Sequence, residues 1–571
     1  MHPSAHNSVA LIARKDDLAV CRDSCDRWYV GNLLLDCLSK GLFIVTVHIK
    51  LSSSSWNESR QGKLKKRGSC LQTIEGLLTA KTTSDVQEQL AAQNGFYALI
   101  WQQCNVTYAA VDHVRSIPLF YGLKDQQFYL SDDADWVREK IGNIEMDPIA
   151  KEEFLLAGYV TGRDTLYPDV KQLQAGEFLV INNEGLAPDI HTERYYRFLH
   201  TEPKSYDEPL LRQRLEDVTL KAAQRLIEHA AGRQLVLPLS GGYDSRLIAT
   251  MLKRLGYTNV LCFTYGVPGN KEALYSQKVA EALGFDWAFV EYSANHWKRA
   301  WRTEEAEQYR RMASNHVSLP HVQDWLAIRE LLSKGQISSA SILVPGHSGD
   351  FVAGSHIPEF VFESFEHSEE SLLQRLIQDH LSNAPNDGMK LDDGSLLRQR
   401  LRNRIGIPFN GSDVCIANLY ELWDWQERQS KYIVNSVRVY EQFDLEWWLP
   451  LWDIDFVKFW QEVPLSLRKR RAWFKNWIDE QYGLVAGEEA SSSRLGNASD
   501  VSGQLKFLKA ISDLLPVSIQ NRLKVLWASR IAKKHFLGFE GLVTDGEVRK
   551  FLSKGYNIIG IYSLLYIMKK W

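Results

Sequence analysis

Residues 240–245, which read Ser-Gly-Gly-Tyr-Asp-Ser, combine residue types that bind phosphate groups and a divalent cation. The two glycines let the backbone come close to an anion, and the two serine hydroxyls can donate hydrogen bonds to it. Asp244 supplies a carboxylate of the kind that binds magnesium carried by a polyphosphate. The spacing is not that of a Walker loop, and a Ser/Gly turn that only caps a helix would have the same composition. The residues that we assign to phosphate binding are Ser240, Gly241, Gly242, Asp244 and Ser245.

The secondary structure expected around this segment favours the first interpretation. A strand over 234–239 precedes it, and a helix follows in which Leu247, Met251 and Leu255 share one apolar stripe. A second strand over 260–265 completes a βαβ unit with two parallel strands. In such a unit, backbone N–H groups of the turn and the positive end of the helix dipole point toward one place. We therefore expect a phosphate group to bind there.

The second half of the chain continues this alternation. A helix around 276–283 and strands at 288–292 and 341–344 predict an α/β domain with a doubly wound parallel sheet. Beyond about residue 360 the pattern is mainly helical, with tryptophans that are more often packing anchors than a ligand site. Four of them are Trp447, Trp448, Trp452 and Trp460.

The first half has short apolar runs separated by polar turns, which predict a sheet-rich domain. The runs lie at 43–47, 97–101, 128–130 and 177–181. The polar stretch 51–68 is expected to be a loop. Helical spacing begins shortly after residue 200, so we predict one domain over 1–200 and a second over 201–571.

Residues 239–246 resemble the pyrophosphate-binding loop of the asparagine synthetase family, and later segments match that family in the same order. Residues 263–269 resemble its second strand and the turn that holds adenine, and 272–284 resemble the helix that follows. Residues 345–354 resemble its second magnesium-binding loop, which makes Asp350 the implied partner of Asp244. Through this resemblance the nucleotide-binding residues also include Phe263, Gly266 and Gly346.

The resemblance implies an enzyme that forms amide bonds and uses ATP with Mg2+. A carboxylate of the substrate would attack the α-phosphate of ATP, giving an acyl-adenylate and pyrophosphate, and ammonia or an amine would then displace AMP. Magnesium between Asp244 and Asp350 would neutralise charge on the leaving pyrophosphate. Family members also supply a lysine from the C-terminal helical region, and here Lys475 is favoured over Lys469 for that role.

Residues 112–121 and 158–162 resemble the family's class II glutaminase domain, which implies a sheet sandwich in the first half. Glutaminases of this type use an N-terminal cysteine whose own α-amine serves as the base. His2 stands at that place, and Cys21 or Cys25 could replace it only after trimming of the chain. We therefore expect a degenerate domain that does not hydrolyse glutamine.

The second loop also departs from the family pattern. Asparagine synthetases proper carry acidic residues at the places of His347 and Phe351, near the amino-acid substrate. A cationic or apolar neighbour favours other substrate groups than a carboxylate does. The expected acceptor is therefore a small molecule or peptide with a carboxylate, rather than free aspartate.

Two other functions stay open. The chain could close a macrolactam ring, as lasso-peptide cyclases and β-lactam synthetases of this family do, with an amine supplied by the substrate itself. It could instead be a non-catalytic ATP-binding scaffold, although the two magnesium carboxylates argue against that. Sulfur or amine transfer to tRNA is disfavoured by the charge balance and the missing cysteine pair.

Composition narrows the remaining possibilities. A chain of 571 residues with 45% hydrophobic and 24% charged residues is typical of a folded multidomain protein. A formal net charge of -3 provides no overall attraction to nucleic acid, and no apolar stretch is long enough to span a membrane. Seven scattered cysteines are not a disulfide framework, and His316 with His321 lacks the further ligands of a metal site. We expect a cytoplasmic protein and leave homodimer formation open.

Overall fold

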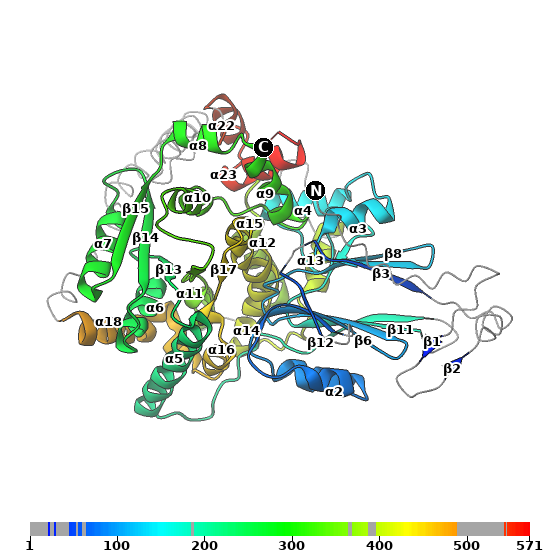
Figure 1. The fold of residues 1–571 in the computed structure, drawn as a ribbon, viewed down its shortest axis with the longest axis horizontal. Helices are drawn as coiled ribbons and strands as arrows, with labels where there is room; N and C mark the ends of the chain where they lie inside the picture. Colours follow the sequence, from blue (N-terminus) through cyan, green and yellow to red (C-terminus); the bar gives the residue numbers. More distant parts are fainter. Residues whose placement is uncertain are drawn as a thin grey trace.

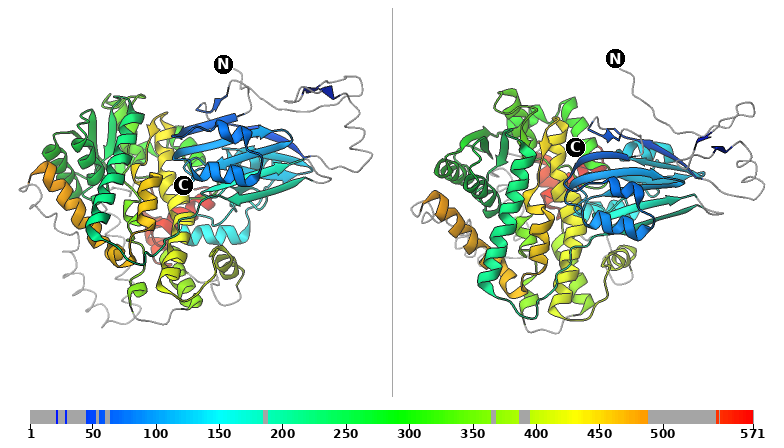
Figure 2. Two further views of the ribbon diagram at one scale, coloured as in Figure 1. Left: turned by 90° about the horizontal axis from the view of Figure 1, so that it is seen from below. Right: turned by 60° about the horizontal axis from the view of Figure 1, so that its bottom comes forward.

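The computed structural model of the chain consists of two parts that pack against each other. Its described residues are 21–22, 28–29, 45–52, 55–59, 64–183, 188–363, 368–385, 395–487, 542–543 and 545–570. One part is a β-sandwich, drawn in blue and cyan in Figure 1, and the other is an α/β domain built on a parallel sheet. The views in Figure 2 keep the two parts side by side, with helices of the second part lying along the end of the sandwich.

Two sheets form the sandwich, with strand orders β10-β8-β9-β3 and β12-β11-β7-β6-β5-β4. The first sheet contains β3 (Thr46–Lys50), β8 (Phe120–Lys124), β9 (Gln127–Ser131) and β10 (Lys171–Gln172). The second contains β4 (Asn57–Glu58), β5 (Leu64–Cys70), β6 (Gly95–Gln103), β7 (Val106–Val111), β11 (Glu177–Asn182) and β12 (Asp189–Arg194). Two further short strands, β1 (Cys21–Arg22) and β2 (Trp28–Tyr29), pair with each other.

Strand β6 shows why the apolar run at 97–101 has no polar alternation. Ala98 and Ile100 belong to the core between the two sheets, whereas Tyr97 and Leu99 pack on the opposite face with helix α2 (Thr83–Ala91). Successive side chains of a strand point to opposite faces. Because both faces of β6 are covered, all of these positions are apolar.

The prediction of a sheet-rich first half is confirmed, with one correction. The stretch 51–68, expected to be a loop, contains β4 and the beginning of β5. Within β5, Arg67 forms ion pairs with Asp132 at 3.2 Å and with Glu441 of the α/β domain at 2.6 Å. The polar sequence of β5 therefore forms a strand because its backbone hydrogen-bonds to β6 and because Arg67 has ion-pair partners.

The second part contains a five-stranded parallel sheet with the order β15-β14-β13-β16-β17. The strands are β13 (Leu235–Pro238), β14 (Val260–Gly266), β15 (Asp286–Glu291), β16 (Ile342–Leu343) and β17 (Glu446–Trp447). The chain moves outward from β13 to β15 and then returns to the other side of β13 with β16. This order confirms the doubly wound sheet and puts its topological switch point between β13 and β16.

Helices cover this sheet and connect it to the sandwich. In the sandwich and at its edge they are η1 (Glu75–Thr79), α3 (Ala134–Ile141) and α4 (Pro148–Ala157). Around the parallel sheet they are α5 (Glu208–Ala230), α6 (Tyr243–Arg254), α7 (Lys271–Leu283), α8 (Ala294–Ala300), α9 (Glu304–Ser314), α10 (Trp325–Ser333) and α11 (Gly349–Val352). Later ones are η2 (Glu359–Phe362), α12 (Glu369–His380), α13 (Leu396–Arg404), η5 (Pro450–Trp452), α16 (Ile454–Gln461), α17 (Leu465–Arg468), η6 (Lys469–Arg471), α18 (Ala472–Ala486), α22 (Asp545–Leu552) and α23 (Ile558–Ile567). None of the helices in the described part of the chain is long and apolar enough to cross a membrane.

The core of the second part confirms the role predicted for the tryptophans. Trp448, Trp452 and Trp460 are buried and belong to one apolar cluster with the strands of the parallel sheet, and Trp447 packs against that cluster. The cysteines whose side chains the structure describes form no disulfide; they are Cys70, Cys104, Cys262 and Cys415.

A long helical stretch joins the two parts. It consists of α14 (Asp413–Trp423), a π-helical segment η3 (Asp424–Ile433), η4 (Val434–Val437) and α15 (Arg438–Gln442). On η3, Glu427 accepts a hydrogen bond from the backbone N–H of Gly162 at 2.9 Å and pairs with Lys431 at 2.5 Å. Lys431 also donates to the carbonyls of Val160 at 3.1 Å and Gly162 at 2.6 Å. Because both charged side chains are fully buried, the sandwich fixes the position of η3.

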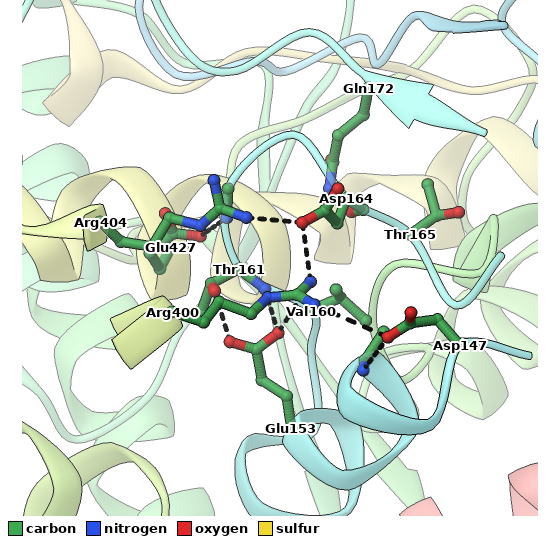
Figure 3. Close-up of polar contacts among 12 residues, drawn as sticks. Asp147, Glu153, Val160, Thr161, Asp164, Thr165, Gln172, Arg400, Arg404 and Glu427 are labelled. Atoms are coloured by element: carbon green, nitrogen blue, oxygen red, sulfur yellow. Dashed lines mark hydrogen bonds and ion pairs between the residues drawn. The ribbon is translucent and has the colours of Figure 1, made fainter. Parts of the chain in front are cut away.

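More ion pairs surround this contact (Figure 3). Arg404 pairs with Asp164 at 2.5 Å, and Arg400 pairs with the same carboxylate at 2.9 Å. Arg400 also lies 3.5 Å from Glu153, a buried carboxylate that accepts hydrogen bonds from Thr161. The sandwich and the α/β domain are therefore joined by ion pairs between specific charged side chains.

Lys431→Met should destabilise the chain. The variant leaves the carboxylate of Glu427 buried without its ion-pair partner, and breaking such a pair costs about 3–5 kcal/mol. Urea denaturation followed by tryptophan fluorescence should show this as a lower midpoint. The control is Lys334→Met, because Lys334 is 54% exposed, lies 3.9 Å from Glu330 and should contribute about 0.5 kcal/mol or less. Equal midpoints for the two variants would contradict the role given to the buried pair.

Candidate active site

A cavity of 460 Å³ lies at the switch point, beyond the ends of β13 and β16. Residues of the two loops that follow these strands line it, namely Ser240, 242–245, 345–348 and Asp350. The rest of its wall consists of Pro238, His321, Gln323, Asp324, His356, Arg428, Gln429, Ile433, Ser436 and Arg471. The cavity is therefore built from parts of the chain that are far apart in sequence.

The first loop is arranged to receive an anion. The hydroxyl of Ser240 accepts a hydrogen bond from the backbone N–H of Gly242 at 3.1 Å, and the hydroxyl of Ser245 accepts one from the N–H of Ser240 at 3.3 Å. Helix α6 begins directly afterwards at Tyr243, and its N-cap residue Gly242 provides no side-chain cap. The first N–H groups of α6 and the positive end of its dipole therefore face the cavity without a side chain in between.

The second loop packs directly on the first at two glycines. A Cβ atom on Gly346 would lie 2.7 Å from both Cα and N of Ser245. On Gly349 a Cβ atom would lie 3.0 Å from the carboxylate carbon of Asp244. Since contacts this short are not tolerated, only glycine permits the loops to touch.

Asp244 and Asp350 meet where the loops touch. The backbone N–H of Asp350 donates to the carboxylate of Asp244 at 2.9 Å. Burial and the negative charge of Asp350 raise the pKa of Asp244 to about 7, although Arg471 opposes the shift from 3.4 Å. Two carboxylates in one small space form a set of oxygen ligands that suits a divalent cation. In the described part of the chain, no group of three or more His, Cys, Asp or Glu side chains is arranged to hold a metal ion.

His356 compensates part of this negative charge. It lies between Asp350, at 3.6 Å, and Asp424 of η3, with which its Nδ1 forms a hydrogen bond. Burial acts to lower the pKa of His356, but the two carboxylates raise it to about 10. Burial acts to raise the pKa of Asp350, but His356 lowers it to about 2. At neutral pH these two residues therefore form a cation and an anion.

The C-terminal helical region brings basic groups to the first loop. Arg471 lines the cavity, and Nζ of Lys475 lies 5.8 Å from the ring centre of Tyr243, another cavity residue. Lys469 lies over the ring of Phe362 at 5.3 Å and does not line the cavity. Lys475 does not line the cavity either, but of the two lysines named from the sequence it is the one next to a residue of the first loop.

Two family models match this architecture. Residues 223–480 match the model described as asparagine synthase, and residues 63–196 match a glutamine amidotransferase domain. The second part of the chain thus contains an asparagine synthase domain. The predicted division at residue 200 falls between the two matched regions, and we keep it as a proposal.

The individual proteins that resemble this chain are distant from it in sequence. Asparagine synthetase [glutamine-hydrolyzing] 1 of Bacillus subtilis (strain 168) is 24% identical over 204 residues, which are 35% of this chain and 31% of that protein. The match thus spans about a third of that relative. An NH3-dependent NAD synthetase from Campylobacter jejuni is 13% identical with a TM-score of 0.20, covering 34% of this chain and 98% of the other. An NMN synthetase from Francisella tularensis is 11% identical with a TM-score of 0.20, covering 40% and 97%. Both TM-scores are too low to support any statement about the fold or function of this chain.

Some residues assigned to the nucleotide through the family resemblance do not line the cavity. Phe263 is fully buried in β14, and Gly241 faces the ring of Tyr275. Gly266 ends β14 with a φ of 134°, which favours glycine. Their role in nucleotide binding stays a prediction, since the structure places them in the strand and turn next to the cavity.

Phe351 does not face the cavity, which corrects the expectation of an apolar group beside the substrate. Its ring is buried and packs against Phe198 at 5.0 Å and Trp452 at 5.8 Å. Asp350 and Phe351 are consecutive residues of α11, and consecutive helical side chains point about 100° apart. With Asp350 directed to the cavity, Phe351 is directed to the core.

His347 does line the cavity, as a neutral side chain rather than a cation. Its Nε2 lies 3.1 Å from the hydroxyl of Ser436, and burial lowers its pKa to about 4. His321 lines the cavity too, and burial also lowers its pKa. His316 pairs with Asp135 at 2.8 Å, so its role is structural.

Sequence reasoning missed the groups that η3 and its surroundings bring to the cavity. His356, Arg428, Gln429 and Arg471 line it, yet none belongs to a motif. The available signal was weak: the sequence of η3 is mostly polar, as in a solvent-exposed helix, and His356 follows the second loop closely. Only the fold shows that these positions face the first loop.

Gly346→Ala should destabilise the chain by about 1–3 kcal/mol, because a Cβ atom at 2.7 Å from the backbone of Ser245 forces the two loops apart. Thermal denaturation measures the effect. The control is Gly546→Ala on α22, where an added Cβ meets no atom within 4 Å and a helical alanine is favoured. If the two variants melt alike, the close approach of the loops is not required.

Proposed function

We propose that this chain is an ATP-dependent carbon–nitrogen ligase that activates a carboxylate as an acyl-adenylate. The single observation that supports this most is the meeting of Asp244 and Asp350 at the uncapped start of α6. The family membership of residues 223–480 supports ATP-dependent amide-bond formation in general. Neither observation identifies the acceptor or the amine.

In the proposed reaction, a carboxylate oxygen of the acceptor attacks the α-phosphorus of ATP, and the bond to the leaving pyrophosphate breaks. An amine nitrogen then attacks the acyl carbon, AMP leaves, and the nitrogen loses a proton. Ser240, Ser245 and the N–H groups at the start of α6 would bind the phosphates, because they are hydrogen-bond donors aimed at one place. Arg471 and Lys475 would stabilise negative charge as pyrophosphate departs.

Magnesium fits the residues present. Asp244 and Asp350 offer oxygen ligands of like charge, and a divalent cation between them relieves their repulsion. When bound with ATP, magnesium would neutralise charge on the phosphates. Its remaining ligands would come from the nucleotide and water.

We further propose that the nitrogen that attacks the acyl-adenylate does not come from hydrolysis of glutamine. Free ammonia, or an amine on the acceptor or on a second substrate, would enter the cavity directly. Supplying ammonium or glutamine as the only nitrogen source separates these cases, and product formation with glutamine alone would contradict this part of the proposal.

Asp244→Asn should abolish the exchange of labelled pyrophosphate into ATP that depends on a carboxylate acceptor. The amide keeps the shape of the side chain but loses the charge needed for the cation. Asp286→Asn, an exposed change on β15, should keep wild-type exchange. Release of ADP instead of AMP would exclude adenylation, and nucleotide binding without turnover on a broad acceptor panel would favour a scaffold.

Lys475→Met should lower turnover by roughly a hundredfold, since it removes a cation beside the leaving pyrophosphate. Lys469→Met should leave turnover nearly unchanged, because Lys469 packs on Phe362 away from the cavity. Steady-state AMP formation measures both variants. The reverse order of effects would assign the catalytic role to Lys469.

A further inference from the structure

One cation of the cavity has no task in the proposed reaction. Arg471 contacts Asp244 at 3.4 Å, and His356 lies between two carboxylates. Arg428 of η3 lines the same cavity, and its side chain is 35% exposed. Its one ion-pair contact in the described part of the chain, with Asp424, is 4.0 Å long.

Asp424 is already committed to other partners. Its carboxylate accepts hydrogen bonds from the ring of His356 and from the side-chain amide of Gln429, the latter at 3.3 Å. Burial opposes ionisation of Asp424, but His356 lowers its pKa and keeps it anionic. Arg428 therefore retains N–H donors that can point into the cavity.

The cavity groups nearest to Arg428 in the chain and in the hydrogen-bond network are uncharged. Gln429 follows it directly and accepts a hydrogen bond from the hydroxyl of Ser348 at 2.9 Å. His347, next to Ser348, is neutral and contacts Ser436. Burial acts to lower the pKa of Arg428, but the negative charges of Asp424 and Asp350 raise it, so the guanidinium stays charged. A charged guanidinium with N–H donors left over from its 4.0 Å contact with Asp424 is suited to bidentate binding of a carboxylate.

The backbone that carries Arg428 is held in place from the other side of η3. Glu427 is the preceding residue, and its contacts with Gly162 and Lys431 attach η3 to the sandwich. A π-helical turn is a frequent feature of functional sites. The guanidinium is thus presented by a rigid support, as precise recognition of a ligand requires.

We propose that Arg428 binds a carboxylate of the acceptor, and that η3 is the acceptor side of the cavity. This inference rests on the proposed function, which requires a carboxylic acid to lie in the same cavity as ATP. It adds the residue that recognises the acceptor and predicts that the acceptor enters as an anion.

Thermal shift measurements on the full chain can test this with simple probes. Glutarate and glucuronate serve as carboxylates, and glutaramide and glucuronamide serve as their uncharged counterparts. Each is added with and without magnesium and the non-hydrolysable ATP analogue AMPCPP. The variants are Arg428→Gln and Arg428→Lys. Arg311→Gln is the control because Arg311 is 71% exposed and, within the described residues, its ion pair is with Glu307 on its own helix.

We expect a carboxylate to raise the melting temperature of the wild type while the amides do not. Arg428→Gln should weaken carboxylate binding about tenfold or more, Arg428→Lys should retain part of it, and Arg311→Gln should match the wild type. The variants should bind AMPCPP as the wild type does.

The proposal is overturned if neither carboxylate shifts the wild type, if the amides act equally, or if Arg428→Gln keeps full carboxylate binding. It is also overturned if Arg428→Gln loses AMPCPP binding instead, because Arg428 would then belong to the nucleotide. If the chain binds carboxylates through Arg428 but does not bind AMPCPP, the ATP-dependent function is refuted. The carboxylate site at Arg428 is then still supported.

Discussion

The contact between the loops that follow β13 and β16 is the constraint on which the site depends. The N–H of Asp350 reaches the carboxylate of Asp244 at 2.9 Å only because Gly346 and Gly349 have no Cβ atoms to keep the loops apart. That contact places two carboxylates at the start of α6, where backbone N–H groups already favour an anion. This is the arrangement that we propose for binding an anion and a cation together, as ATP with magnesium would require.

Charge compensation around this contact comes from elements outside the βαβ units. His356 carries the positive charge between Asp350 and Asp424, and Arg471 approaches Asp244 from the C-terminal region. Without them, the two neighbouring carboxylates would repel each other. The helical C-terminal part thus contributes charge to the site in addition to covering the sheet.

The sandwich has a structural function that does not require glutamine hydrolysis. Its residues 160–162 hold Glu427 and Lys431 of η3 through buried hydrogen bonds, while the opposite side of η3 lines the cavity with Arg428 and Gln429. The sandwich is therefore needed to position this helix whether or not it hydrolyses glutamine. This gives a physical reason for a glutamine amidotransferase domain beside an asparagine synthase domain.

The sequence by itself determined the strand, loop and helix around Ser240 and the order of segments in the second half. These features are local, because strand periodicity, glycine positions and helix stripes are encoded by neighbouring residues. The pairing of Asp244 with Asp350 is not local, and it followed from the sequence only as an implication of the family resemblance. Only the tertiary structure decided that Phe351 faces the core, that His347 is neutral, that β5 is a strand and that Arg428 reaches the cavity. These outcomes depend on burial and on charges brought from distant parts of the chain, and no local pattern encodes either of them.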